Sequence, residues 1–333
     1  MAKRKRIALL YGGASNEHDV SVMGYEYMIE LISDTEYEIL PVYIERDGTW
    51  SVTVKDARVY AYPTAMLGGS LYTARGFIKI DVAIPLLHGD GGEDGSVEGA
   101  LECAGIPYVG AGVCTSAMCL DKTYTKAIAE SLGIPTLKSV SPKRGESDIA
   151  ALEKCKSILN FPMFVKPRRL GSSVGAYPIP NEEEFLKCYP LATRAGDGLV
   201  IVEECLGDKR ELECAFIEIG KERIVTPPGE VLIDGFYGYS EKYGGKTKTS
   251  PRAKLPKDIS DTVVDYGNRL ADAIGLRHLG RIDFFLSEGK IYFNEINTFP
   301  GFTRESLYPK MLECYGIHPR DAILSFVKDA LSW

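Results

Sequence analysis

The run Gly280-Arg281-Ile282-Asp283, followed by Asn294-Glu295-Ile296-Asn297, decides the fold of the last third of the chain. In each run an isoleucine stands between two polar residues, as in strands that have one buried face. We therefore expect a β-hairpin over residues 281–297 that turns around Gly289. The segments on either side can then be read outward from this hairpin.

The hairpin would collect four polar side chains on one face. A turn around Gly289 predicts Asp283 opposite Glu295 and Arg281 opposite Asn297, whereas a slip of one residue would scatter the set. Oxygen ligands of this kind suit Mg²⁺, which keeps further positions for water and phosphate oxygens. The alternative is a solvated charged face. An apolar opposite face favours a strand pair inside a core, and its expected members are Ile282, Phe284, Tyr292 and Ile296.

A lysine and a loop of small residues come earlier in the chain. Lys166-Pro167 ends one expected strand, and Gly171-Ser172-Ser173-Val174-Gly175 leads into the next. Small residues let backbone N–H groups approach phosphate oxygens, and the lysine supplies positive charge. The loop is not a P-loop, because no Gly-Lys-Ser/Thr opens a helix here. Taken alone, it is equally consistent with a simple hairpin turn.

Other strand ends also carry polar residues. Residues 200–206 form an apolar strand that ends in Glu203 and Glu204, which suits an adenine amino group and ribose hydroxyls but also a plain acidic edge. Residues 12–21 run from a strand into a helix whose start attracts anions, and Glu17 there could hold an ammonium group. Residues 88–95 form a glycine-rich loop, in which a satisfied loop histidine and a helix cap are the alternatives to chemistry.

Strands and helices alternate in the first third of the chain, which is the pattern of an α/β fold with an open, mostly parallel, doubly wound sheet. Strands are expected at residues 5–11, 39–44 and 81–87, and helices at 19–33, 95–104 and 121–132. The remainder has α+β character, with strands at 163–166, 174–179 and 198–204 and helices at 181–189, 259–274 and 319–331. The long irregular segment 234–256 predicts a lid or an insert.

The overall composition narrows the classes of function. The formal charge of −7 gives no basic face for nucleic acid, and no apolar stretch approaches a membrane span, so neither partner is expected. The eight cysteines are scattered without a CxxC pair, as in reduced cytoplasmic proteins. The apolar run after the basic residues 3–6 is too short for a signal peptide.

In their order along the chain, these segments resemble the D-alanine–D-alanine ligases, a branch of the ATP-grasp enzymes. The matching segments are residues 12–21, 88–95, 119–122, 166–175, 241–243, 280–283 and 295–307. The resemblance implies three domains, at residues 1–121, 122–210 and 211–333, with ATP grasped between the last two and residues 234–256 as a lid. It also implies ATP, two Mg²⁺ ions with Mn²⁺ as an alternative, D-amino acid substrates, a homodimer and a cytoplasmic location.

The resemblance assigns one set of residues to ATP and metal. Those implied for ATP are Lys122, Lys166, Ser172, Ser173 and Val174 at the phosphates, Glu203, Glu204 and Leu206 at adenine, and Glu211 at the ribose. Those implied for Mg²⁺ are Asp283, Glu295 and Asn297.

A second set is implied for the amino acids. Glu17 would bind the first substrate's ammonium group, and Arg281 with the backbone N–H of Gly301 would bind the oxyanion. A hydrogen-bonded trio of Glu17, Ser172 and Tyr243 would tie the lid shut. Further substrate-binding residues implied are Val20, His88 and Lys242, with Ser306 and Leu307 at the second substrate's carboxylate.

The chain departs from the family pattern around the second substrate. Residues 303–306 read Thr-Arg-Glu-Ser where Thr-Ser-His-Ser is usual, and one residue is inserted near Lys209. Leu307 stands where D-serine ligases commonly have arginine, and Lys242-Tyr243 resembles dipeptide-forming rather than depsipeptide-forming members. No general base for the attacking amine is evident.

The sequence therefore predicts an ATP- and Mg²⁺-dependent ligase that joins two D-alanines through an acyl phosphate, for peptidoglycan precursor synthesis. Two alternatives stay open: a ligase with D-serine or another D-amino acid as second substrate, and a catalytically inactive ATP-binding regulator. A dinucleotide-binding oxidoreductase does not fit, because the glycine fingerprint is missing.

Overall fold

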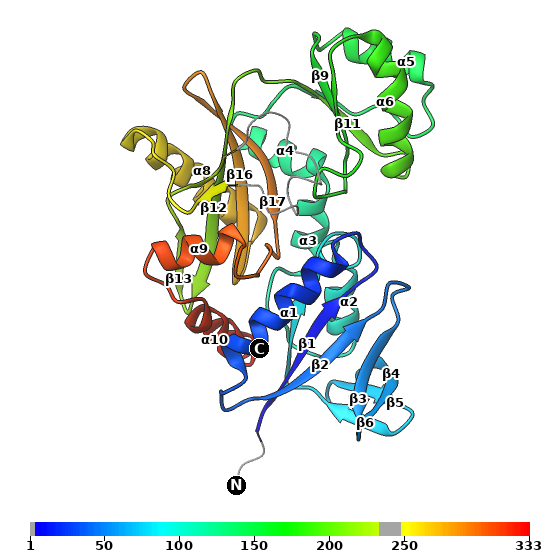
Figure 1. The fold of residues 1–333 in the computed structure, drawn as a ribbon, viewed down its shortest axis with the longest axis vertical. Helices are drawn as coiled ribbons and strands as arrows, with labels where there is room; N and C mark the ends of the chain where they lie inside the picture. Colours follow the sequence, from blue (N-terminus) through cyan, green and yellow to red (C-terminus); the bar gives the residue numbers. More distant parts are fainter. Residues whose placement is uncertain (1–3, 233–247) are drawn as a thin grey trace.

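The computed structural model describes residues 4–232 and 248–333 of the chain. In this part of the chain three sheets follow one another along the long axis of the molecule (Figure 1). The N-terminal sheet lies at one end, the C-terminal sheet in the middle, and the central segment of the chain forms the sheet at the other end. Within these residues, no helix combines the length and apolar character that crossing a membrane requires.

The N-terminal sheet has seven strands in the order β6-β5-β4-β3-β2-β1-β7. At its centre, β1 (Arg6–Gly12) pairs in parallel with β2 (Glu38–Ile44) and β7 (Val82–Leu86). Apolar residues of β1 alternate between two core clusters, so α1 (His18–Ile32) covers one face and α2 (Ser96–Cys103) the other. The predicted doubly wound parallel arrangement is confirmed for this half of the sheet.

The other half of the N-terminal sheet is antiparallel, which the sequence analysis did not anticipate. Its strands are β3 (Trp50–Val54), β4 (Ala57–Thr64), β5 (Ser70–Thr73) and β6 (Gly76–Lys79). Lys55 and Asp56, with φ of 48° and 61°, form the two-residue turn between β3 and β4. This left-handed turn is made without glycine, so the usual hairpin signal was missing from the sequence.

The central sheet is antiparallel, in the order β10-β9-β11-β8. Its strands are β8 (Ser139–Val140), β9 (Met163–Pro167), β10 (Tyr177–Ile179) and β11 (Val200–Glu204). The helices α5 (Asp148–Lys156) and α6 (Glu182–Ala195) share one apolar core with it. The strand expected from residue 174 begins only at Tyr177, because Ser172, Ser173 and Gly175 have positive φ. The helix expected to end at residue 189 continues through Pro190.

The C-terminal sheet follows the order β15-β14-β12-β16-β17, with β13 paired to β12. Its strands are β12 (Arg210–Ile219), β13 (Glu222–Val225), β14 (Gly229–Leu232), β15 (Lys248–Ser250), β16 (Leu279–Ser287) and β17 (Lys290–Asn297). One face packs against α3 (Val113–Leu120), α4 (Lys122–Ser131) and α8 (Lys257–Ile274). The other face packs against α9 (Leu307–Cys314) and α10 (Pro319–Ala330).

The β16–β17 hairpin has the predicted register at its open end. Arg281 pairs with Asn297, and Asp283 pairs with Glu295. The two-residue turn at Glu288-Gly289 would by itself place Asp283 opposite Asn294, because Ser287 pairs with Lys290. The register shifts by one residue between Asp283 and Phe284, which leaves Asn294 as the extra residue of a β-bulge. The bulge therefore brings Glu295 and Asn297 to the face that carries Arg281 and Asp283.

The bulge also corrects one assignment. Tyr292 was expected on the apolar face, but it pairs with Phe285 on the other side, and Phe293 takes its place beside Phe284 in the core. Ile282 and Ile296 lie in the apolar core as predicted.

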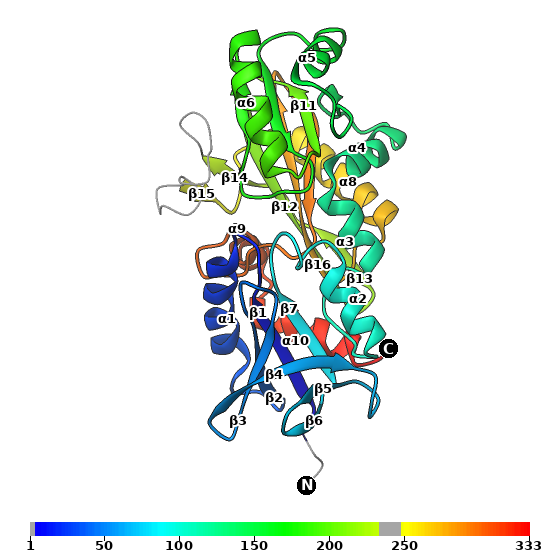
Figure 2. The same cartoon turned by 90° about the vertical axis from the view of Figure 1, so that its right-hand side faces the viewer.

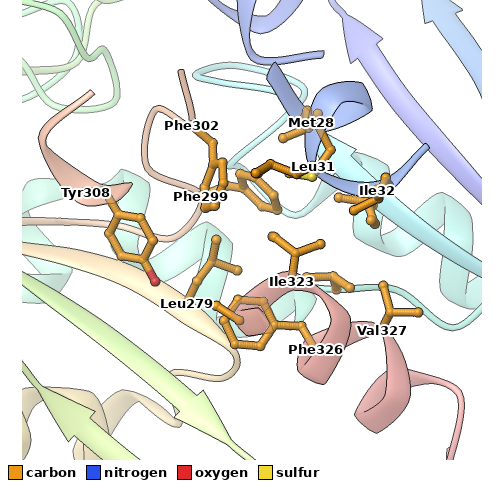
Figure 3. Close-up of a cluster of buried hydrophobic side chains, with 14 of the residues drawn as sticks. Met28, Leu31, Ile32, Leu279, Phe299, Phe302, Tyr308, Ile323, Phe326 and Val327 are labelled. Atoms are coloured by element: carbon orange, nitrogen blue, oxygen red, sulfur yellow. The ribbon is translucent and has the colours of Figure 1, made fainter. Parts of the chain in front are cut away.

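One apolar cluster joins the first and last parts of the chain. Figure 3 shows Met28, Leu31 and Ile32 of α1 facing Ile323, Phe326 and Val327 of α10. Figure 2 shows α10 against the N-terminal sheet, although it follows the C-terminal sheet in sequence. Phe299 and Phe302, just after β17, enter the same cluster. The loop that follows β17 is thereby anchored between the two sheets.

Candidate active site

Two cavities meet where the three sheets approach one another. The larger has a volume of about 400 Å³, and its lining includes Glu17, Val20, His88, Glu93, Arg281, Asn297, Gly301, Ser306 and Leu307. The smaller has a volume of about 120 Å³, and its lining includes Lys166, Ser173, Val174, Lys209, Glu211 and Asn294. Both are lined by Lys122, Ser172 and Glu295. Residues from distant parts of the sequence thus converge on one connected space.

The polar face of the hairpin is held together by an arginine–carboxylate pair. Arg281 donates from Nε to Asp283 Oδ1 at 2.8 Å and from Nη2 to Asp283 Oδ2 at 2.7 Å. Its Nε also lies 3.3 Å from Glu213 Oε2 on the neighbouring strand β12. Asn297 donates from Nδ2 to Asp283 Oδ2 at 3.2 Å. The guanidinium is therefore fixed in direction, with its charge available at the wall of the larger cavity.

The oxygen atoms of this face fit a hard divalent cation. Asp283, Glu295 and Asn297 offer the oxygen atoms of two carboxylates and an amide. No group of three or more His, Cys, Asp or Glu side chains arranged for a metal ion occurs within the described ranges. A set with so few protein donors suits Mg²⁺, because this ion is usually bound by one or two carboxylates together with phosphates and water.

Lys122 stands where the two cavities join. It is the first residue of α4 and is 6% exposed, with Nζ 3.2 Å from Glu295 Oε2 and 2.8 Å from the carbonyl oxygen of Leu170. Asp121 caps the helix and accepts two bonds from Arg168, from Nε at 3.0 Å and Nη2 at 2.7 Å. These contacts tie the start of α4 to the segment before the glycine-rich loop.

The glycine-rich loop covers the smaller cavity. Ser172 and Ser173 have φ of 52° and 58°, a left-handed backbone conformation that residues other than glycine seldom adopt. The Ser172 hydroxyl donates to Glu17 Oε1 at 2.5 Å, so the loop contacts the N-terminal part of the chain directly. Strained backbone held in place by such contacts is characteristic of ligand-binding loops.

Lys166 reaches the same space from β9. Its Nζ donates to Asn294 Oδ1 at 3.2 Å and pairs with Glu203 Oε2 at 2.7 Å. The other oxygen of Glu203 lies 2.7 Å from Nζ of Lys126, which is almost completely buried on α4. Burial by itself would raise the pKa of Glu203, but attraction to the two lysines outweighs it and lowers the pKa to about 2. Lys126 was not predicted from the sequence, because its role depends on its ion pair with Glu203.

The residues assigned to adenine and ribose lie at the outer end of β11 and on β12. Glu203 faces the two lysines, and Glu204 accepts from the backbone N–H of Lys138 at 2.9 Å. Leu206 is the second residue after the end of β11. Glu211 lines the smaller cavity and pairs with Lys209 at 2.9 Å. Lys209, beside the predicted insertion, was not foreseen as a lining residue.

Three titratable groups from the N-terminal part of the chain line the larger cavity. Glu17 lies just before α1, and His88 and Glu93 lie in the loop after β7. Glu93 accepts from the N–H of Gly89 at 2.9 Å and from that of Phe299 at 3.2 Å. Burial, with the nearby charge of Glu17, raises the pKa of Glu93 to about 8. The sequence offered no sign of this role, since Glu93 is one of several acids in a glycine-rich loop.

Gly301, Ser306 and Leu307, which follow β17, also line the larger cavity. Ser306 is the N-cap of α9, and its hydroxyl accepts from the N–H of Thr303 at 3.0 Å. The two unusual charges that precede Ser306, on Arg304 and Glu305, are both paired. Arg304 binds Glu30 of α1, and Glu305 pairs with Lys310 at 2.7 Å.

The residues predicted for ATP and metal and the residues predicted for the amino acids thus lie around one connected space. Glu295 pairs with Lys122, Asn297 donates to Asp283, and Ser172 donates to Glu17. The predicted residues Lys242 and Tyr243 lie outside the described residues.

Comparison with known proteins identifies the family of the chain. Two family models cover most of the chain: D-ala D-ala ligase N-terminus over residues 6–111, and D-ala D-ala ligase C-terminus over residues 128–328. The chain belongs to the D-alanine–D-alanine ligase family. The resemblance noted from the sequence is thereby confirmed.

Individual relatives of this family match over nearly the full length. The chain is 37% identical to a D-alanine–D-alanine ligase of Thermoanaerobacter sp. (strain X514), covering 94% of the chain and 93% of the relative. A solved structure of D-alanyl-alanine synthetase A from Vibrio cholerae superposes with a TM-score of 0.90 at 31% identity, with full coverage of both chains. The VanG D-Ala:D-Ser ligase of Enterococcus faecalis superposes with a TM-score of 0.89 at 30% identity, covering 98% of this chain and 100% of that one.

Proposed function

We propose that this member of the family joins two D-alanines to D-alanyl-D-alanine, with ATP and Mg²⁺, through an acyl phosphate. The observation that carries the proposal is the convergence of the Arg281–Asp283 pair, the oxygens of Glu295 and Asn297, and Lys122 on one space closed by the Glu17–Ser172 contact. Family membership supports the reaction, and the arrangement of these groups supports the assignment of roles.

The smaller cavity would take the ATP phosphates. Lys122 and Lys166 offset the charge that builds up during phosphoryl transfer, and the backbone of Ser172, Ser173 and Val174 covers the phosphates. Adenine and ribose would lie outward along β11 and β12, toward Glu203, Glu204, Leu206 and Glu211. The close ion pairs of Glu203 give it the added task of orienting Lys166.

Asp283, Glu295 and Asn297 would hold two Mg²⁺ ions, with Mn²⁺ as a substitute. When bound, the metal neutralises phosphate charge and holds the transferring group in line.

The larger cavity would take the two amino acids. Glu17, with Val20 and His88 beside it, receives the ammonium group of the first D-alanine. Arg281 and the N–H of Gly301 stabilise the oxyanion that forms when the second amine attacks. Ser306, Leu307 and Lys242 receive the carboxylate of the second D-alanine, and Tyr243 completes the contact of the lid with Glu17 and Ser172.

This division of the site follows from the chemistry. A carboxylate is a poor electrophile, so phosphoryl transfer from ATP first makes the acyl phosphate of the first D-alanine. The amine of the second then attacks the acyl carbon, and phosphate leaves. Water would destroy the acyl phosphate, so we assign a closing lid to residues 234–247, which lie outside the described residues. The remainder of the expected segment 234–256 is not all irregular, because Lys248–Ser250 form β15 of the C-terminal sheet.

D-serine is the competing second substrate, because the VanG D-Ala:D-Ser ligase superposes so closely. Leu307 favours D-alanine, since an apolar side chain at the second subsite leaves a serine hydroxyl without a partner. We further propose a role in peptidoglycan precursor synthesis in the cytoplasm, a homodimer, and domains at residues 1–121, 122–210 and 211–333.

Mass spectrometry of the product formed from ATP, Mg²⁺ and a mixture of D- and L-amino acids tests the function. We expect D-alanyl-D-alanine as the main product, with one ADP released for each dipeptide. If a mixed dipeptide were the main product, its second amino acid, and not D-alanine, would be the second substrate. Tight nucleotide binding without any amino-acid-dependent ADP release would favour an inactive regulator instead.

A further inference from the structure

The proposed reaction needs a proton acceptor. The α-ammonium group of an amino acid is mostly protonated near neutral pH, and only the neutral amine has the lone pair that attacks the acyl carbon. The inference below rests on the proposed function and concerns the group that removes this proton. Such a group must lie at the cavity wall, be unprotonated at neutral pH, and have a free lone pair.

His88 meets the geometric conditions. It lies after β7 in the larger cavity and is 6% exposed. Its Nδ1 is 3.0 Å from the carbonyl oxygen of Phe299. Because a carbonyl oxygen only accepts, Nδ1 carries the hydrogen, and in the neutral ring Nε2 carries the lone pair. Nε2 is buried and finds no hydrogen-bond partner among residues 4–232 and 248–333. A buried acceptor of this kind needs a reason to stay unpaired.

The anchoring partner of His88 strengthens this reading. Phe299 holds the ring through its carbonyl oxygen, while its N–H donates to Glu93. Phe299 also enters the apolar cluster between α1 and α10, so the peptide that orients the ring is itself fixed. Gly301, whose N–H is assigned to the oxyanion, follows two residues later. The imidazole and the oxyanion donor are therefore held by the same short loop.

Burial, more than the surrounding charges, favours the neutral ring. Burial lowers the pKa of His88, and the Arg281 guanidinium lowers it further, while the Glu17 carboxylate and the bond to Phe299 oppose this shift without reversing it. Glu93, anchored between Gly89 and Phe299, lies in the same wall. The other charged side chains lining the cavity are Lys122, Glu213, Glu295, Glu305 and Lys310.

We propose that His88 is the general base of the ligation step, accepting through Nε2 a proton from the ammonium group of the second amino acid. The freed lone pair forms the C–N bond to the acyl carbon, and the carbonyl π electrons move to the oxyanion held by Arg281 and Gly301. The oxyanion then collapses, the C–O bond to phosphate breaks, and the second proton of the nitrogen leaves with phosphate. The imidazolium returns its proton to water when the site opens.

The variant His88→Gln separates this role from a structural one. Its side-chain amide can still donate to the Phe299 carbonyl and fill the space, but it cannot take up a proton at neutral pH. Two reactions are compared, each with ATP, Mg²⁺ and D-alanine. One measures dipeptide formation, and the other measures hydroxamate formation when hydroxylamine traps the acyl phosphate. Hydroxylamine is a nucleophile of low basicity and is already neutral at pH 7, so it needs no base.

We expect His88→Gln to lower kcat for the dipeptide by about 100- to 10,000-fold at pH 7. The loss should diminish as pH rises, while hydroxamate formation stays within about twofold of the wild type. The matched control is His318→Gln, at the exposed N-cap of α10, which should leave both reactions unchanged. An equal loss of dipeptide and hydroxamate would place His88 in acyl phosphate formation or in folding and overturn the proposal. Undiminished dipeptide formation would overturn it as well.

The wild-type enzyme provides a test that no folding defect can obscure. Its kcat for the dipeptide should fall on the acid side with the titration of one group, and the hydroxamate reaction should lack that acid limb. Identical pH profiles for the two reactions would contradict the assignment. A wild-type enzyme that forms neither product from D-alanine contradicts the proposed function instead, so the two failures are distinguishable.

Discussion

Glu17 and Ser172, 155 positions apart in sequence, are joined by a hydrogen bond of 2.5 Å between a carboxylate oxygen and a hydroxyl. This bond connects the N-terminal unit to the glycine-rich loop of the central unit. It therefore makes the geometry of the glycine-rich loop depend on Glu17, the residue that we propose for the first substrate.

The first prediction concerns this bond. Glu17→Gln and Ser172→Ala should each lower kcat/KM, but the double variant should lose less than the sum of the two. A charged hydrogen bond predicts a coupling free energy of about 1–3 kcal/mol. A double-mutant cycle on kcat/KM for D-alanine measures it. Additive effects would show that the two side chains act independently, and Ser131→Ala, on the exposed surface of α4, serves as the control.

The second prediction concerns Arg281. Arg281→Lys keeps the charge but cannot make both bonds to Asp283, so the cation loses its direction. We expect kcat to fall by about 100- to 1,000-fold, the usual loss for one oxyanion donor. ATP binding, measured by calorimetry, should change little. A normal kcat in this variant would show that Arg281 does not stabilise the transition state. Arg269→Lys on α8 is the matched control.

The third prediction concerns the β-bulge. Insertion of one alanine between Asp283 and Phe284 should give Asn294 a partner, remove the bulge, and move Asp283 and Glu295 to the apolar face of the hairpin. Burying an unpaired carboxylate there should cost about 3–5 kcal/mol of the free energy of unfolding and abolish Mg²⁺-dependent turnover. Urea unfolding and ADP release measure the two effects. Asn294→Ala keeps the residue count and should fold normally, losing only the bond to Lys166.

The fourth prediction concerns Lys126. Lys126→Met removes one of the two cations that neutralise Glu203, so Lys166 is held more strongly by the remaining pair. We expect ATP to bind more weakly and the free energy of unfolding at neutral pH to fall by about 1–3 kcal/mol. Because the folded pKa of Glu203 is depressed to about 2, its stabilisation is present above its unfolded pKa and is lost toward pH 2. The variant and the wild type should therefore converge in acid. Lys328→Met on the exposed side of α10 is the control.

The fifth prediction is a pH dependence of stability. The pKa of Glu93 is raised to about 8 in the folded chain, so the folded state retains a proton that the unfolded state has lost between pH ~4.3 and 8. The contribution of Glu93 is complete below its unfolded pKa and is lost as pH rises through about 8. The free energy of unfolding should thus fall by up to about 1.4 kcal/mol per pH unit in this interval. Glu93→Gln should flatten that slope, and an unchanged slope would assign the pH dependence to other groups.

The hairpin was predicted well because the spacing of its polar and apolar residues and the glycine in its turn are local features of the sequence. The pairing of Asp283 with Glu295 was predicted correctly, but the bulge that produces it was not. A bulge is stabilised by its surroundings, here the contact of Asn294 with Lys166 from another sheet. The misplaced Tyr292 follows from the same omission. The antiparallel half of the N-terminal sheet escaped prediction because Lys55-Asp56 lacks a turn signal.

The site residues that sequence reasoning missed are those defined by their partners. Lys126 and Glu213 matter because they contact Glu203 and Arg281. Glu93 matters because it bridges Gly89 and Phe299 across the site. Such contacts join segments far apart in the chain, and no local pattern of residues encodes them. Residues that belong to a motif were therefore expected to lie together, whereas the residues that contact and support them were not foreseen.

The apolar cluster shared by α1, α10 and Phe302 has a consequence for how the molecule melts and moves. It makes the two outer thirds of the polypeptide a single cooperative block, since neither can separate without exposing the other's interior. The four-stranded unit has its own separate interior, built only from residues 140–202. On heating, the four-stranded unit should therefore unfold or separate first. Domain motion during turnover should be a rigid-body movement of this unit relative to the rest of the chain.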